Sequence, residues 1–186
     1  KAAERAAAKA EAERKKAEKI NKYIQQYGLE NKSKEENPEN EDIPWLIFCH
    51  EWIQIGDGRI LAMRLREDLK EPIGQPITLF SASSAPWVRP LDAGKYVTDG
   101  PFLFHQDGKL CMLWSSFTER GYAMGLAKSI SGSIIGPWKQ MNEPLYNDDE
   151  GHGMRFQTFD GKFMIVMHSP NHFPEHPVIR SFERIF

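Results

Sequence analysis

Acidic and imidazole side chains stand at the ends of three similar apolar segments of this 186-residue sequence. Glu51 follows the first segment, Asp99 opens the second and His152 opens the third. Carboxyl and imidazole groups are the side chains that most often transfer protons in enzymes. If the three segments fold alike, their ends meet and these side chains gather in one polar site.

The three segments predict antiparallel β-structure. In residues 98–116, alternating bulky residues flank Asp107-Gly108, which is a strong signal for a β-hairpin. The pattern returns in residues 151–169 around Asp160-Gly161, and residues 43–52 resemble the second half of a further copy. Hairpins that recur at roughly 50 residues are typical of β-propeller blades. A β-sandwich whose hairpins are similar by chance explains the same pattern.

The remaining strands follow from short apolar runs between turn residues. We predict strands at residues 45–49, 60–65, 76–80, 121–129, 136–140 and 178–186, with a loop at 83–87. Each unit then has three or four antiparallel strands, and the predicted fold class is all-β from residue 43 onwards.

Residues 1–29 consist mainly of Ala, Glu, Lys and Arg, which favour an α-helix. Glu11 and Lys15 have the spacing and order of a helical ion pair. A solvated helix, a docking or coiled-coil helix and a fusion segment all fit this composition. Residues 30–42 have no apolar period and are predicted to form a flexible linker.

Composition narrows the range of functions. The formal net charge is −2, so we expect no nucleic-acid partner. No apolar run approaches the ~18 residues of a membrane span, and no signal peptide is visible. Because the sequence does not begin with Met, we expect a processed, truncated or engineered chain. Cys49 and Cys111 occupy equivalent positions in two hairpins, and we expect buried free thiols rather than a disulfide.

Residues 43–186 resemble the C-terminal part of glycoside hydrolase family 43, in particular arabinofuranosidase- and xylosidase-like members from gut bacteria of the Bacteroides type. Residues 1–42 lie outside this resemblance. The stretches that carry it are Phe48-Cys49-His50-Glu51-Trp52-Ile53-Gln54, residues 79–87 and 97–102, residues 112–117, Gly136-Pro137-Trp138, Gly151-His152-Gly153-Met154 and His168-Ser169-Pro170-Asn171. Their common order along the chain makes the resemblance specific.

The resemblance implies a five-bladed β-propeller with an active site at one end of its central channel. It also implies inverting hydrolysis of arabinosyl or xylosyl linkages in plant polysaccharides, in which one carboxylate activates water and another acid protonates the leaving oxygen. At about 50 residues per blade, residues 43–186 supply about three blades. The family's catalytic base stands on a first blade that has no counterpart here, so we expect a truncated enzyme behind an unrelated N-terminal helix.

The resemblance also assigns candidate roles. We expect Glu51 to be the proton donor. Asp99 stands where most of the family has the donor Glu, and we expect it to position the donor or the sugar. The candidate sugar-binding residues are Trp52, Gln54, Phe102 and Trp114. The simpler alternatives are a loop-capping Glu51, an Asx-turn at Asp99 and aromatic side chains that belong to the core.

His152 matches a His of the family's central channel, which often binds a calcium ion directly or through water. Calcium prefers oxygen ligands, so a hydrogen-bonded channel His is the alternative. Trp87 and Trp138 are expected to pack between blades.

Three functions therefore remain open for this chain. It is an active glycosidase, or a catalytically silent propeller fragment, or an interaction module whose working part is helix 1–29. The silent fragment would bind oligo- or polysaccharide, or assemble with partner blades, or with itself, through open sheet edges. Family members are often periplasmic or secreted, whereas this sequence indicates no compartment.

Overall fold

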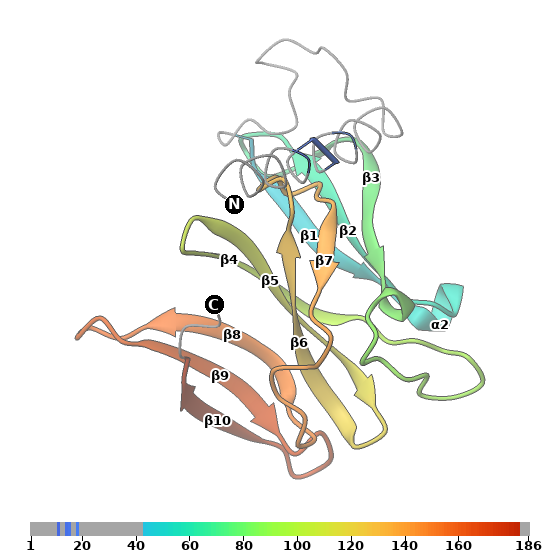
Figure 1. The fold of residues 1–186 in the computed structure, drawn as a ribbon, viewed down its shortest axis with the longest axis vertical. Helices are drawn as coiled ribbons and strands as arrows, with labels where there is room; N and C mark the ends of the chain where they lie inside the picture. Colours follow the sequence, from blue (N-terminus) through green and yellow to red (C-terminus); the bar gives the residue numbers. More distant parts are fainter. Residues whose placement is uncertain (1–10, 12–13, 16–17, 19–42, 183–186) are drawn as a thin grey trace. The chain divides into compact units, whose positions relative to one another are not determined.

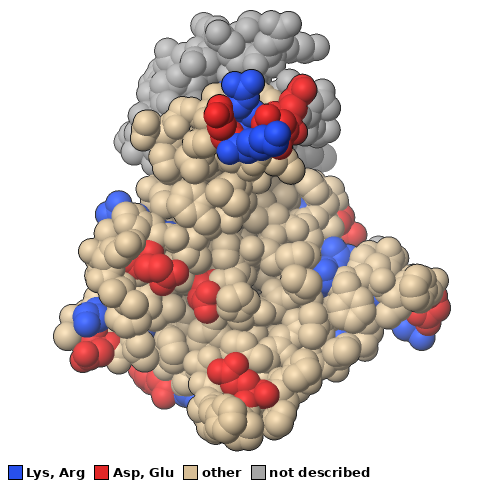
Figure 2. All heavy atoms as spheres, turned by 180° about the vertical axis from the view of Figure 1, so that it is seen from behind, with Lys and Arg blue, Asp and Glu red and all other residues tan. Residues whose placement is uncertain are grey.

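The computed structural model describes residues 11, 14–15, 18 and 43–182, and the chain divides into two compact units, residues 1–43 and 44–186. Within the described residues, no helix is both long enough and apolar enough to cross a membrane. On the described part of the face seen in Figure 2, acidic and basic side chains lie in small separate groups among neutral residues.

Residues 11, 14, 15 and 18 of the first unit are helical. The Arg14 guanidinium lies 3.0 Å from the Glu11 carboxylate and 2.9 Å from the Glu18 carboxylate. Lys15 Nζ lies 3.4 Å from Glu11 Oε1, which is the ion pair that the sequence spacing indicates. The remainder of the predicted helix 1–29 and all of the predicted linker lie outside the described residues.

The second unit contains three antiparallel sheets, and within each sheet the strands are neighbours in chain order (Figure 1). The first sheet consists of β1 (Trp45–His50), β2 (Arg59–Leu65) and β3 (Pro72–Ser81). The middle sheet consists of β4 (Asp99–Gln106), β5 (Lys109–Thr118), β6 (Gly121–Ser129) and β7 (Trp138–Gln140). The third sheet consists of β8 (Gly151–Gln157), β9 (Phe163–Ser169) and β10 (His176–Ser181). The predicted all-β class of this unit is confirmed.

Several boundaries agree closely with the sequence-based prediction. Strand β6 begins and ends at the predicted residues, and β9 ends at residue 169, the last residue of the predicted third copy. Asp107 and Gly108 connect β4 to β5 with φ values of +50° and +70°, the left-handed conformations that favour this pair in a hairpin. The turn around Asp160 is wider, because the last β8–β9 pair is Gln157 with Phe163 and residues 158–162 lie between them.

The first sheet differs from the prediction at two places. Strand β3 begins at Pro72 rather than at residue 76, and its pairing with β2 shifts near Gly74 and Pro76. Proline cannot donate to the strand ladder and Gly74 has a φ of +76°, so this part of β3 forms an irregularity instead of ending the strand. The unpredicted helix α2 (Trp52–Ile55) is a single turn, closed by the Gly56 N–H, which donates to Trp52 O at 2.7 Å.

The middle sheet is covered on both faces, and its strand β5 is buried from Leu110 to Ser116. Successive side chains of a strand point to opposite faces. Met112 and Trp114 therefore pack with the first sheet, while Cys111 and Leu113 pack with the third. This double burial explains why β5 is a nearly continuous apolar run rather than an alternating one.

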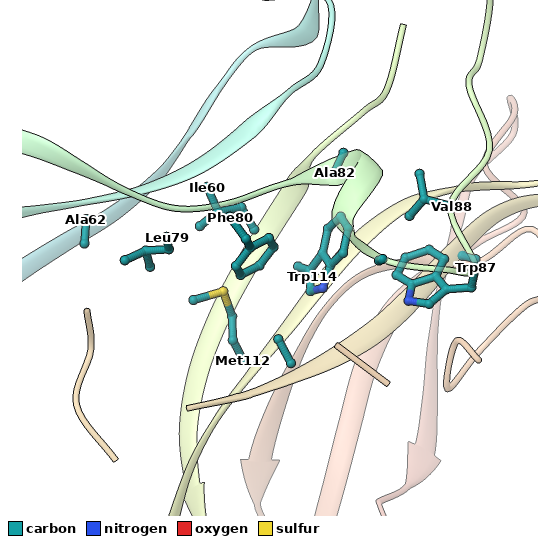
Figure 3. Close-up of a cluster of buried hydrophobic side chains, with 12 residues drawn as sticks. Ile60, Ala62, Leu79, Phe80, Ala82, Trp87, Val88, Met112 and Trp114 are labelled. Atoms are coloured by element: carbon teal, nitrogen blue, oxygen red, sulfur yellow. The ribbon is translucent and has the colours of Figure 1, made fainter. Parts of the chain in front are cut away.

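Aromatic rings join the first and middle sheets. Figure 3 shows Trp114 between Phe80 and Trp87, with ring-centroid distances of 5.2 and 5.0 Å. The ring centroid of Trp138 lies 6.5 Å from that of Phe80, and Trp138 packs against the cluster formed by these aromatic rings. The 3₁₀-helix η1 (Ala82–Ser84) leads from β3 into the loop that carries Trp87. The predicted packing roles of Trp87 and Trp138 are confirmed.

Both cysteines are free thiols, as predicted, and we expect both to resist modification in the folded chain. Burial raises the pKa of the Cys49 thiol to about 12 and also raises the pKa of Cys111, so neither forms the reactive thiolate at pH 8. Ellman's reagent at pH 8 is expected to titrate no thiol in the native chain and both thiols in guanidinium chloride. A Cys49→Ala variant, which retains only Cys111, assigns any signal. Rapid reaction of a full equivalent in the native chain would contradict the burial of the thiols.

Candidate active site

Two strands of the second unit begin with the same local irregularity. In β4, Asp99 pairs with Ser115, and the register then shifts before Phe102. In β8, Gly151 pairs with His168, and the register shifts before Met154. A bulge of this kind redirects the side chain at the start of a strand. The repeat expected from the sequence is therefore present at the strand ends that carry Asp99 and His152.

The Asp99 carboxylate is the centre of a hydrogen-bonded group. Its Oδ1 accepts the Gly100 N–H at 2.9 Å, and its Oδ2 accepts the Tyr122 hydroxyl at 2.6 Å. His152 Nδ1 lies 3.1 Å from the same Oδ2. The side chains of Asp99 and His152 remain 38% and 55% exposed, so a ligand can reach both. Sequence reasoning identified Asp99 and His152, and the structure brings them into contact.

Tyr122 supports the Asp99 carboxylate from the interior of the protein. Its buried ring stacks on the His168 ring, with centroids 5.4 Å apart and an interplanar angle of 10°. Burial, followed by the negative charge of Asp99, raises the pKa of Tyr122. The phenol therefore stays protonated and remains a hydrogen-bond donor to Asp99 across the physiological pH range.

Two glycines allow His152 to lie where it does. A Cβ on Gly151 would lie 2.5 Å from Cε1 of the Tyr122 ring, and a Cβ on Gly100 would lie 3.0 Å from the His152 ring. The His152 backbone has a φ of +48°, and its N–H donates to Ser115 Oγ at 2.9 Å. This hydrogen bond helps to hold a left-handed conformation that is uncommon for a residue with a Cβ.

Glu51 lies at the end of β1 and precedes α2, where its side chain is exposed and makes no capping hydrogen bond. Burial is the main cause of the raised pKa of Cys49, and the negative charges of Asp99 and Glu51 add to it. Strands β1 and β4 are in contact, and Glu51 directly follows the last residue of β1.

Three of the four predicted sugar-binding residues are at least partly exposed, and one is fully buried. Trp52 and Gln54 lie on α2, where Trp52 is half-buried below Lys95 Nζ and Gln54 is exposed. Phe102 is half-buried and stacks on Phe104. Trp114 was wrongly predicted to contact the sugar, because it is fully buried between Phe80 and Trp87 and its indole N–H donates to Gln140 Oε1 at 3.0 Å. The two-sided burial of β5 leaves this ring no exposed face.

The residues around His152 do not fit a calcium ion held by protein ligands. Calcium takes six to eight oxygen ligands. Among the described residues, no group of three or more His, Cys, Asp or Glu side chains could hold a metal ion. The contact of His152 with Asp99 favours the alternative of a hydrogen-bonded His.

Sequence reasoning missed two acidic residues immediately before the Gly-His-Gly motif. Asp149 Oδ1 accepts the Tyr122 N–H at 3.1 Å, and its Oδ2 accepts the Asn171 N–H and faces His172 Nδ1, each at 3.1 Å. Glu150 is buried and accepts a 2.8 Å hydrogen bond from Arg180 Nη1. The run Asn147-Asp148-Asp149-Glu150 gave no distinctive signal, because polar residues between strands are typical of loops.

The chain is similar to glycoside hydrolases in sequence and in structure. Residues 38–183 match the profile of glycosyl hydrolases family 43. The crystal structure of an endo-arabinase from Bacteroides thetaiotaomicron is 47% identical with a TM-score of 0.74, over 78% of this chain and 54% of that one. A comparison with curated protein sequences found no match.

More distant structures share the fold. An endo-1,4-beta-xylanase from Bacteroides thetaiotaomicron is 23% identical with a TM-score of 0.59, over 76% of this chain and 50% of that one. An alpha-L-arabinofuranosidase from Lactobacillus brevis is 18% identical with a TM-score of 0.59, over 76% and 52%. This chain thus spans about half the length of each of these three structures.

We expect Asp149→Asn to lower the free energy of unfolding by about 1–2 kcal/mol near pH 7, because the three contacts of the carboxylate are weakened. Partial burial opposes ionisation, but the hydrogen bonds from Tyr122, His172 and Asn171 outweigh it and lower the pKa of Asp149. A native pKa below the unfolded value stabilises the fold above the unfolded pKa, and this contribution is lost as pH falls through the native pKa. The difference between the two proteins, measured by urea unfolding, should therefore shrink below about pH 4.

The matched control is Asp148→Asn, because Asp148 pairs only with the exposed Arg120 among the described contacts and should change stability by less than about 0.5 kcal/mol. An equal loss for Asp149→Asn at pH 7 and at pH 3 would show that the carboxylate charge does not matter.

Proposed function

The chain belongs to glycosyl hydrolase family 43, and we propose that it cleaves arabinosyl or xylosyl linkages in plant polysaccharides. The observation that carries this proposal is the half-exposed Asp99 carboxylate, held by Tyr122 and Gly100 and in contact with His152. The 47% identity to a protein described as an endo-arabinase supports the arabinosyl substrate. In this proposal the three sheets are consecutive blades of a five-bladed β-propeller.

The two carboxylates have different surroundings, and their proposed roles follow from them. The Asp99 carboxylate accepts hydrogen bonds from Gly100 and Tyr122, so it is suited to orienting a neighbouring group or a sugar hydroxyl. Glu51 is exposed and free of capping contacts, so its carboxyl group can approach the glycosidic oxygen. Glu51 is therefore the proposed general acid, and Asp99 is the proposed positioning residue.

Inverting hydrolysis also needs a base that activates water on the opposite side of the sugar. In this proposal the base comes from a further sheet that is not among the three described here. Protonation by Glu51 releases the leaving sugar as its alcohol, while water adds to the anomeric carbon and loses its proton to that base. Trp52 and Gln54, on α2 directly after Glu51, are the proposed sugar contacts, with Phe102 as a further candidate.

A second candidate function is assembly with partner blades, and one surface favours it. Met154, Val166 and Ile179 form a row across the third sheet, because β8, β9 and β10 pair at these residues. Met154 is 54% exposed and Ile179 is 61% exposed, and neighbouring Phe156 is 37% exposed. The opposite face, with Ile165 and Met167, is buried against the middle sheet. An apolar sheet face of this kind is suited to packing against another sheet.

Substitution of the two carboxylates tests the enzymatic proposal. Without the sheet that supplies the base, we expect the chain to release sugar from arabino-oligosaccharides only slowly, still with inversion, which NMR of the first-formed anomer detects. Glu51→Gln is expected to lower kcat by about 10²–10⁴-fold on natural linkages but far less on an aryl arabinofuranoside, whose leaving group needs no proton. Asp99→Asn is expected to slow both substrates. Glu67→Gln, an exposed Glu after β2, is the matched control.

Two outcomes would contradict these roles. Equal losses on both substrates for Glu51→Gln would remove it as the general acid. No turnover by the unmodified chain would exclude hydrolysis by these three sheets alone and would favour the assembly function.

The assembly function predicts self-association when the exposed row has no other partner. We expect the sedimentation coefficient of the purified chain to rise with concentration, and Ile179→Lys to reduce this rise because it places a charge in the apolar row. Leu69→Lys is the matched control, since Leu69 is 63% exposed but lies in the turn between β2 and β3. A chain that stays monomeric and hydrolyses substrate would contradict the assembly function.

A further inference from the structure

A buried ion pair lies directly before Gly151 and His152 in the chain. The Glu150 side chain is 1% exposed, and its Oε1 accepts a hydrogen bond from Arg180 Nη1 at 2.8 Å. Arg180 Nη2 contacts Oε2, so each carboxylate oxygen faces one nitrogen of the guanidinium. Glutamate is almost never fully buried unless it is paired. A buried charge at this position therefore needs a physical explanation.

Arg180 reaches this carboxylate from the edge strand of the third sheet. It lies on β10, where it pairs with Ile165, a residue of the buried face of that sheet. Directly opposite residues lie on the same face, so Arg180 points inward, whereas neighbouring Ile179 belongs to the exposed face. Arg180 Cζ also lies 5.9 Å from the ring centroid of Tyr146, in the segment that leads to Glu150. The ion pair thus ties β10 to the segment between the middle and third sheets.

The backbone on both sides of Glu150 has a conformation that residues with a Cβ rarely adopt. Asp149 has a φ of +57°, and His152 has a φ of +48°. Left-handed conformations of this kind persist when the surrounding contacts determine them. Glu150 lies between the two, and its N–H donates to Tyr122 O at 3.1 Å. A fixed Glu150 side chain therefore limits how this backbone can relax.

Stability alone does not account for a buried ion pair. The cost of removing two charges from water often exceeds their mutual attraction, and an apolar pair of similar volume is commonly as stable or more so. Burial raises the pKa of Glu150, and the positive charge of Arg180 opposes this effect. An ion pair differs from an apolar contact in its direction, because two oxygens must face two nitrogens in one orientation.

We propose that this ion pair fixes the backbone that leads to His152, so that the imidazole ring stays against Asp99. The ring lies 3.1 Å from Asp99 Oδ2 and rests against Gly100. Glu150 and Arg180 are thus positioning residues, which act through the backbone and do not touch the substrate. The inference rests on the proposed function for the reaction that the site performs, but the position of the ring can be measured without turnover.

The test measures the contact between His152 and Gly100 in the full chain by NMR. A nuclear Overhauser effect (NOE) from the His152 ring to the Gly100 α-protons is expected in the unmodified chain. Glu150→Gln and Arg180→Met each remove the ion pair, and we expect each to lose at least about half of this NOE. With arabino-oligosaccharides, both variants should lower kcat about tenfold and leave KM nearly unchanged, because a misplaced group slows the reaction more than binding.

Two further variants separate positioning from stability. Glu150→Leu/Arg180→Leu replaces the ion pair by an apolar contact, so its urea midpoint should lie close to that of the unmodified chain while the NOE is still lost. Leu79→Ala is the matched control, because it removes buried apolar contacts in the first sheet and should lower the urea midpoint while the NOE is retained. Loss of the NOE in Leu79→Ala, or full retention in all three ion-pair variants, would overturn the proposal.

Hydrogen exchange in the unmodified chain provides a measurement that needs no variant. The N–H groups of Glu150 and His152 donate to Tyr122 O and Ser115 Oγ. After correction for intrinsic rates, we expect both to exchange at least about tenfold more slowly than the N–H of Phe159, which lies in the exposed turn between β8 and β9. Exchange as fast as that of Phe159 would show that the backbone before His152 is not held, and would overturn the proposal.

The outcomes also separate this proposal from the proposed function. If Glu51→Gln and Asp99→Asn cleave as fast as the unmodified chain while the ion-pair variants lose the NOE, the catalytic assignment fails and the positioning role stands. If cleavage depends on both carboxylates but the ion-pair variants retain the NOE, the positioning role fails and the catalytic assignment stands.

Discussion

The burial of Tyr122 is the constraint on which the candidate site depends. Its hydroxyl donates to Asp99, its backbone N–H donates to Asp149, and its ring stacks on His168. The contacts with Asp149 and His168 join the middle sheet to the third sheet and to the segment that precedes it. The ring also fills the space above Gly151, so the glycine before His152 follows from the same packing. A single buried side chain thus sets the positions of the carboxylate and the imidazole.

The strands were largely predictable because they depend on local patterns. Alternating apolar residues and Asp107-Gly108 fix the β4–β5 hairpin, and the continuous apolar run of β5 reflects burial on both faces. The failures arose where tertiary context overrides the local pattern. Pro76 suggested a strand start, but an irregularity in β3 accommodates it. Trp114 suggested a sugar platform, but neighbouring sheets cover it.

The candidate site was only half predictable, for a related reason. Asp99 and His152 stand at equivalent points of two similar hairpins, so repetition alone relates them. Tyr122 looks like any other apolar strand residue in the sequence, and only the β5–β6 register shows that its hydroxyl faces Asp99. Asp149 was missed because two of its three partners are backbone N–H groups, at Tyr122 and Asn171, which leave no trace in residue types.

The candidate site and the exposed face of the third sheet differ in how many of their groups are already paired or buried. At the site, most polar groups around Asp99 are already paired, so binding there requires little ordering of the protein. The row of Met154, Val166 and Ile179 is different, because Met154 and Ile179 are exposed, whereas the opposite face of the same sheet is buried against the middle sheet. Full burial of such side chains contributes about 1.5–3 kcal/mol each, which is comparable to a large part of the net stability of a domain. Packing of another sheet on this row would therefore stabilise β8, and β8 carries His152. The open apolar face and the candidate site are thus physically linked through one strand.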